Sequence, residues 1–308
     1  MRFFLLAAAL FAAAPALAEG FSPPVAATSR AMRFETPEGG PLAFRGAIAV
    51  TPPTKRFGAI SGLVMEAPGR ALAVSDIGDW LRFRLLIEDD RLIGIGDVSL
   101  APILDDGGER APKGARNAEG LARDPETGRL WVSFEGYHRI WVFDEPGGAT
   151  RGRVLHPDWT TFRENGGIEA LARDRDGRFW ATGEDGAAED FPVWVGAEDT
   201  WEMKSIPRRG EYQPTGADFG PDGRLYLTER AFSIVGGFRF RLRRFTWGDG
   251  PAPESEETLL TYGAATYIDN IEAVTLWRDD GRTWLLIASD DNLLPVERNV
   301  LALYEVLD

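Results

Sequence analysis

The sequence contains no cysteine and only two histidines, His138 and His156. Without cysteine the chain can form neither a disulfide framework nor a thiolate site. With so little histidine, a zinc site of the usual kind and a Ser-His-Asp triad lack their usual residues. Any catalytic or metal-binding site is therefore expected to consist of oxygen-bearing and basic side chains.

Positive charge is also scarce, because 34 Lys and Arg face 48 Asp and Glu, which gives a formal net charge of -14. Nucleic acid is not expected as a partner, since phosphate binding requires a basic face. The surplus of carboxylates has two interpretations. It serves solubility, or some of the carboxylates converge to hold a cation.

Long apolar runs are absent except at the N-terminus, where residues 1–18 fit a secretory signal peptide. Arg2 supplies the positive charge, residues 3–14 are apolar, and Ala16-Leu17-Ala18 fits the cleavage rule, so the mature chain is expected to start at Glu19. The run is short for a membrane span, and no second run follows. We expect an exported protein, periplasmic or secreted, with no membrane span.

The remaining composition indicates one folded domain rich in short strands. Hydrophobic residues make up 44% of the chain, and 35 Gly and 20 Pro interrupt it at short intervals, which favours strands over long helices. We expect residues 19–30 to form an extended leader and residues 31–308 to form a single all-β domain.

A compound pattern recurs five times: a polar residue, a small residue and an aliphatic residue, then a turn, then a β-prone run ending in a carboxylate. Its clearest copy spans Glu169 to Glu184, with Asp174-Arg175-Asp176-Gly177-Arg178 as the turn. Copies of its first position lie 58, 50, 46 and 57 residues apart. A repeat of this length and content predicts a β-propeller. Five repeats are legible, which leaves five or six blades open, and we expect N- and C-terminal strands to close the ring. A two-sheet β-sandwich is the alternative.

In a propeller the first strand of each blade lines the central channel, so equivalent positions form a ring around one axis. The first ring position holds Ser61, Glu119, Glu169, Thr215 and Glu272. A second position, at the end of the second strand, holds Asp76, Glu135, Glu184, Glu229 with Arg230, and Asp290-Asp291-Asn292. Because the two strands form an antiparallel hairpin, both rings are expected at one mouth of the channel.

So many carboxylates repel one another unless a divalent cation, protonation, or arginines such as Arg230 and Arg116 neutralise them. Calcium is the favoured cation, with another divalent cation as the alternative, and the predicted ligands are Glu119, Glu169, Glu272, Asp290 and Asp76. Glu184 or Glu135 would then act as the base, and Arg230 would bind a substrate oxyanion. The structural alternative is that each Glu caps backbone amides or pairs with a neighbouring arginine.

The same motifs resemble the phytase-like family, described as "esterase-like activity of phytase". They include Ile60-Ser61-Gly62-Leu63, Ala118-Glu119-Gly120-Leu121, Gly167-Ile168-Glu169-Ala170-Leu171, Asp222-Gly223-Arg224-Leu225 and Ile271-Glu272-Ala273-Val274. The resemblance implies an exported β-propeller whose Glu and Asp residues form the functional site. Ser61 and Thr215 interrupt the acidic ring, as expected if only some blades contribute ligands.

Three functions are compatible with these features. The favoured one is a metal-dependent hydrolase of esters, phosphoesters above all, acting on a small anionic or ester substrate. The second is a calcium-dependent lactonase similar to the gluconolactonase propellers. The third is a non-catalytic propeller that binds a ligand. Whether the protein is an enzyme stays open at this point, and a monomer is expected.

Overall fold

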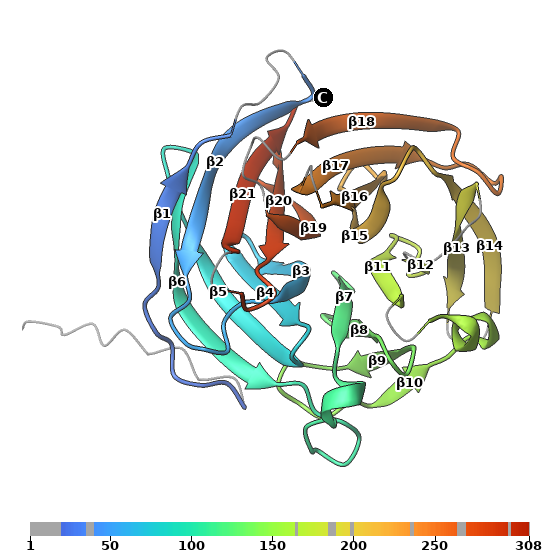
Figure 1. Ribbon diagram of the computed structural model, residues 1–308, viewed down its shortest axis with the longest axis horizontal. Helices are drawn as coiled ribbons and strands as arrows, with labels where there is room; N and C mark the ends of the chain where they lie inside the picture. The colour runs from blue at the N-terminus through green and yellow to red at the C-terminus, as the bar shows by residue number, and fades with distance from the viewer. Residues whose placement is uncertain are drawn as a thin grey trace, which may run out of the picture.

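The computed structural model describes residues 20–34, 40–163, 166–183, 189–197, 200–234, 237–263, 269–294 and 297–307. Five antiparallel sheets stand in a ring around a central axis (Figure 1). The protein is therefore a five-bladed β-propeller, which confirms the all-β prediction and decides between five and six blades. Among the described residues, no helix is long and apolar enough to span a membrane.

The blades follow one another along the chain. Blade 1 consists of β3 (Ile60–Ala67), β4 (Arg70–Ser75), β5 (Asp79–Glu88) and β6 (Arg91–Pro102). Blade 2 consists of β7 (Ala118–Arg123), β8 (Leu130–Phe134), β9 (Arg139–Phe143) and β10 (Gly152–Val154). Blade 3 consists of β11 (Ile168–Arg173), β12 (Phe179–Gly183), β13 (Asp190–Ala197) and β14 (Thr200–Pro207). Blade 4 consists of β15 (Gln213–Phe219), β16 (Leu225–Ser233), β17 (Gly237–Thr246) and β18 (Ser255–Tyr262). Short 3-10 helices, η1 (Lys113–Ala115) and η2 (Pro157–Thr161), precede the first strands of blades 2 and 3.

Blade 5 joins the two ends of the chain, as predicted. It contains β19 (Asn270–Asp279), β20 (Arg282–Asp290) and β21 (Asn299–Val306), followed outward by β2 (Leu42–Thr51) and β1 (Thr28–Met32). The described part of the expected leader does not stand apart from the propeller. Val25 pairs with Val98 of β6, and Phe21 is buried against blade 1.

The core lies between the faces of neighbouring blades. One position in the second strand is aromatic in four blades and is buried in each: Trp131, Trp180, Tyr226 and Trp284. These rings bridge blades. Trp131 of blade 2, for example, packs edge-on against Phe179 of blade 3, with ring centroids 5.2 Å apart. Packing of this kind fixes each blade against its neighbours.

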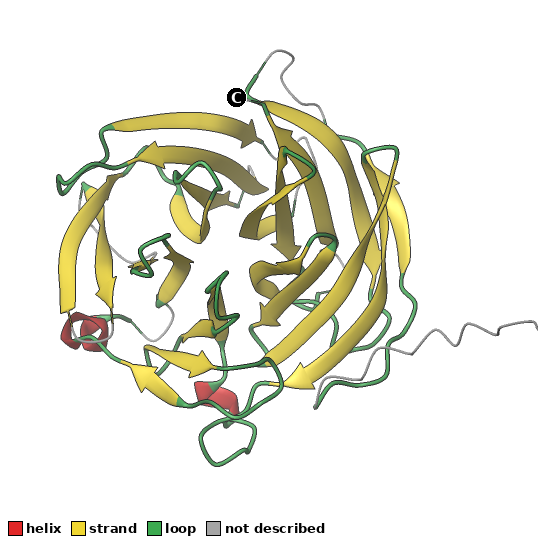
Figure 2. Cartoon of the chain, turned by 180° about the vertical axis from the view of Figure 1, so that it is seen from behind, coloured by secondary structure: helices red, strands yellow, loops and turns green. Residues whose placement is uncertain are grey.

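Turn chemistry orients the inner hairpin of each blade. Gly177 and Gly223 adopt φ values of 78° and 76°, which other residues reach only with strain. Asp174 Oδ1 accepts backbone hydrogen bonds from Asp176 and Arg178 across the first of these turns. The predicted carboxylate positions lie at the other end of the hairpins. We call that end the mouth face and the end with the Asp-Gly turns the turn face. Figure 2 shows the ring of blades from behind, with the loops and turns that join the strands in green.

Candidate acidic site at the channel mouth

The first ring position coincides with a β-bulge in every blade. The innermost strands β3, β7, β11, β15 and β19 contact one another around the axis. In each, the register with the second strand shifts across the ring residue. A bulge leaves one residue out of the ladder and redirects its side chain. The ring residues so displaced, all at most 8% exposed, are Ser61, Glu119, Glu169, Thr215 and Glu272.

A small residue follows each ring residue because the inner strands approach closely there. A Cβ on Gly120 would lie 2.7 Å from Leu171 Cβ, and one on Gly216 would lie 2.2 Å from the carbonyl oxygen of Glu272. The small residue in the recurring motif therefore sets the spacing of the strands at the axis. This spacing brings ring residues of successive blades together.

Three of the glutamates converge. Carboxylate oxygens of Glu119, Glu135 and Glu169 all lie within 4.8 Å of one another. Burial, followed by the charges of Glu169 and Glu135, raises the pKa of Glu119 well above its usual value. Asn117 Nδ2 donates to Glu135 Oε2 at 2.8 Å and holds that carboxylate in place. The donor set is purely carboxylate oxygen, which is what calcium and similar hard cations prefer.

The blade 5 side of the mouth is neutralised differently. Arg230, predicted to bind a substrate oxyanion, forms an ion pair with Glu272 and donates to Asn270 Oδ1. Asn270 Nδ2 also donates to Glu272 Oε1 at 2.7 Å. Burial, followed by the charge of Glu272, raises the pKa of Asp290 to about 9. An arginine and a proton thus offset charge on this side of the mouth.

The remaining members of the second ring differ in their surroundings. Asp76 lies at the mouth, where burial and then the charge of Asp291 raise its pKa to about 6. Its Oδ1 is buried and accepts no hydrogen bond from the described residues. Asp291 itself is engaged by the backbone N–H of Ala59 at 2.8 Å and by Asn299 Nδ2 at 2.6 Å. Glu184 lies outside the described residues.

Glu229 does not face the mouth. It is fully buried between Arg241 Nε at 2.6 Å and Arg243 Nη1 at 2.9 Å, inside blade 4. Its neighbour Arg230 reaches the mouth instead, because successive residues of a strand point to opposite faces.

A pocket of about 310 Å³ opens beside the glutamate trio, between blades 1 and 2. Asp76 and Glu135 line it together with two cations, Lys113 of η1 and Arg116. The side chains of Lys113 and Arg116 make no hydrogen bond or ion pair with any part of the chain that the structure describes. The sequence pattern did not single out Lys113 because it lies in a connection that no other blade repeats. The sequence signal that could have identified Lys113 is its position a few residues before the Glu119 motif.

A second pocket, of about 580 Å³, also opens on the mouth face. Asp291 forms part of its wall, and Phe57, Leu293 and Leu294 make it largely apolar. Leu293 and Leu294 are 42% and 48% exposed, and Leu293 adopts a φ of 51°, which is rare for a bulky residue and is often found at functional sites.

A known protein family matches most of the chain. A model of the family described as "Phytase-like: Esterase-like activity of phytase" matches residues 55–293. The chain belongs to the phytase-like family. The match spans all five inner strands and every ring position, so it agrees with the resemblance carried by the repeated motifs. A search of curated proteins finds no match.

Solved propellers resemble this phytase-like chain only in fold. An α-L-arabinofuranosidase from Clostridium thermocellum is 12% identical, covers 76% of this chain and 82% of its own, and gives a TM-score of 0.51. A protein whose gluconolactonase function is inferred is 11% identical, with coverage of 92% and 93% and a TM-score of 0.47. The aldose sugar dehydrogenase of Streptomyces coelicolor is 13% identical, with coverage of 92% and 99% and a TM-score of 0.43.

Proposed function

We propose that this phytase-like propeller is a calcium-dependent hydrolase of phosphate esters that acts at the channel mouth. The observation that carries the proposal is the convergence of Glu119, Glu135 and Glu169 within 4.8 Å, beside a pocket with two cations. Buried carboxylates repel unless a cation or a proton offsets them. The glutamate trio is suited to hold the metal, and the adjacent cations are suited to hold an anion.

Each group at the site has a separate role in the proposed reaction. Calcium, when bound, would supply positive charge that polarises a phosphoryl oxygen. Lys113 and Arg116 bind the remaining phosphoryl oxygens and orient the ester in the pocket. Asp76 accepts the proton of the attacking water, since a carboxylate with a pKa of about 6 is mostly ionised near neutral pH and is a stronger base than an ordinary aspartate. Water adds to phosphorus, the bond to the ester oxygen breaks, and the leaving alkoxide takes a proton from solvent.

Several roles expected from the sequence are reassigned in this proposal. Asp76, expected as a metal ligand, serves as the base. Glu272 and Asp290 are not among the ligands, because an arginine and a proton offset their charges.

Glu135 joins the metal ligands because it lies within the glutamate trio, and it no longer serves as the base. Arg230 neutralises Glu272, so binding of the substrate oxyanion is assigned to Lys113 and Arg116.

Hydrolysis of a carboxylic ester or a lactone is the second candidate. It is favoured by the apolar pocket of Phe57, Leu293 and Leu294 on the same face, because a substrate with an apolar portion would occupy such a pocket.

The test is turnover of a phosphomonoester, a phosphodiester, a carboxylic ester and a lactone, each with calcium and with chelator. We expect chelator-sensitive cleavage of the phosphomonoester. Replacing Lys113 and Arg116 with Ala should raise KM at least about tenfold, the effect of losing a charge-assisted contact. The matched control is Arg91→Ala, which replaces an exposed arginine at the start of β6.

Lactone or carboxylic ester cleavage alone would replace the proposal with the second candidate. Calcium binding without turnover of any substrate would leave a non-catalytic binding propeller. The proposal also includes export, which rests on residues 1–18 and is checked by locating the processed chain after expression. A monomer is expected, and its mass in solution tests that.

A further inference from the structure

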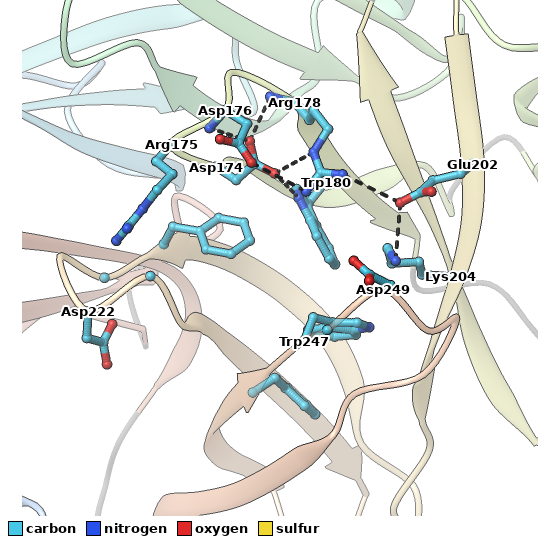
Figure 3. Close-up of a pocket in the computed structure, with 15 residues that line it drawn as sticks. Asp174, Arg175, Asp176, Arg178, Trp180, Glu202, Lys204, Asp222, Trp247 and Asp249 are labelled. Atoms are coloured by element: carbon cyan, nitrogen blue, oxygen red, sulfur yellow. Dashed lines mark hydrogen bonds and ion pairs between the residues drawn. The ribbon is translucent and has the colours of Figure 1, made fainter.

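A groove of about 500 Å³ lies on the turn face, between blades 3 and 4. Figure 3 shows its walls: the Asp174–Arg178 turn and β14 on one side, the Asp222 turn and the segment after β17 on the other. It lies at the opposite end of the inner hairpins from the acidic mouth. The proposed hydrolase function makes no use of it.

Aromatic rings from both blades line the groove. Trp180 of β12 and Trp247 after β17 meet edge to face with centroids 4.9 Å apart, and Phe219 packs against Trp180 at 5.4 Å. Trp180 is buried, whereas Trp247 and Phe219 are only partly buried. The partly buried rings offer apolar surface to a ligand, which is typical of small-molecule sites.

Most of the charged groups in the groove are already engaged. Asp174 Oδ2 accepts from Arg178 Nε and from Trp180 Nε1, both at 2.9 Å. Asp222 Oδ2 accepts from the hydroxyl of Tyr226 at 3.0 Å. Lys204 is buried and donates to the carbonyl oxygen of Gly250 at 2.9 Å. These contacts make the walls rigid and leave few groups for a ligand.

Two exposed charged side chains of the groove are not engaged in this way, one positive and one negative. Arg175 and Asp249 form no hydrogen bond or ion pair with the described ranges of the chain, and both line the groove. Asp249 and Asp176, which also lines the groove, would repel an anion, and Arg175 would repel an organic cation. A hydroxyl group both donates and accepts hydrogen bonds, so it can satisfy a guanidinium and a carboxylate equally.

We propose that this groove binds a neutral carbohydrate. Ring hydroxyls bond to Arg175 and Asp249, and an apolar face of the sugar ring lies against Trp247 and Phe219. The site would hold part of a larger glycosylated ligand or a free oligosaccharide. Both present the same hydroxyl-rich chemistry.

The test is calorimetric titration of the full chain with glucose, maltose, cellobiose and xylobiose, extended to millimolar concentrations. We expect saturable binding of at least one of these sugars. Arg175→Ala and Asp249→Asn should each weaken it at least about tenfold. Both side chains are exposed, so both variants should fold. Arg91→Ala, on the turn face of another blade, should bind as the unmodified chain does.

Three outcomes would overturn the inference. The first is no saturable binding of any of the four sugars. The second is binding that Arg175→Ala and Asp249→Asn leave unchanged. The third is tighter binding of glucose 6-phosphate or of spermidine than of the neutral sugars. Chelator and Glu169→Gln should leave sugar binding intact, so failure of the proposed hydrolase function is distinguishable from failure of this site.

Discussion

Replacing Glu119 with glutamine separates a cation site from a structural glutamate. Glutamine has the shape of a protonated glutamate and no charge. Glu119 lies within 4.8 Å of two other carboxylates, and at an effective dielectric constant of about 20 each charged neighbour at that distance costs about 3 kcal/mol. In chelator, Glu119→Gln should therefore raise the thermal midpoint, by about 6 °C or more for one neighbour relieved.

The size of this stabilisation depends on pH. The pKa of Glu119 is raised in the folded protein, so the folded state holds a proton that the unfolded state releases as pH rises above about 4.5. The chelated wild-type protein accordingly loses stability as pH rises through this window, up to the folded pKa. Glu119→Gln escapes this loss, so its advantage should be near zero at about pH 4 and should grow towards pH 8.

Calcium should offset most of the difference in stability between the two proteins. At a calcium concentration about a hundredfold above Kd, mass action stabilises the wild-type protein by about 2.7 kcal/mol, which is a shift of about 5 to 10 °C. Glu119→Gln should lose most of that shift.

Differential scanning calorimetry at several pH values, with calcium and with chelator, measures all of these quantities. Glu126→Gln, in an exposed turn, is the control. A variant that is less stable in chelator at every pH, with an unchanged calcium shift, would refute the reasoning.

Three further outcomes are expected. Arg230→Met should lower the free energy of unfolding by about 3 to 5 kcal/mol, because the buried charge of Glu272 loses its arginine partner. Adding Glu272→Gln should restore most of the lost stability. A double variant as unstable as Arg230→Met would contradict the pairing. Gly216→Ala should lower the thermal midpoint, because its Cβ would lie 2.2 Å from a carbonyl oxygen of β19; Gly152→Ala, where a Cβ meets nothing within 4 Å, should not, and equal effects would argue against close strand packing. Calcium affinity should increase as pH rises from about 5 to 8, because the raised pKa of Glu119 makes protons compete with the metal; an isothermal titration that gives pH-independent affinity would exclude Glu119 as a ligand.

Local chemistry made the fold predictable. The Asp-Gly-Arg turns need a glycine at positive φ, as Gly177 and Gly223 show, and the aliphatic and aromatic runs between them specify strands. A unit that cannot bury its own faces must stack on copies of itself. Repetition of the unit therefore predicted the propeller, the closing strands, and the placement of Glu119 and Glu169 at one mouth.

The direction of each side chain was less predictable. Glu229 and Arg230 are consecutive, and the pattern alone does not say which of them reaches the mouth. The structure directs Arg230 to Glu272 and directs Glu229 to Arg241 and Arg243. A shift of one residue exchanges the two faces of a strand, and the bulges and the neighbouring blades fix that shift.

The sequence by itself determined the repeat and the position of each carboxylate within its repeat, because these follow from interactions between near neighbours along the chain. Only the tertiary structure decided which carboxylates converge and which are neutralised. Lys113 and Arg116 reach the mouth from a connection unique to blade 2, and Arg175 and Asp249 face one groove from two different blades. Distances between groups far apart in sequence depend on how the blades pack against one another, and no local pattern records them.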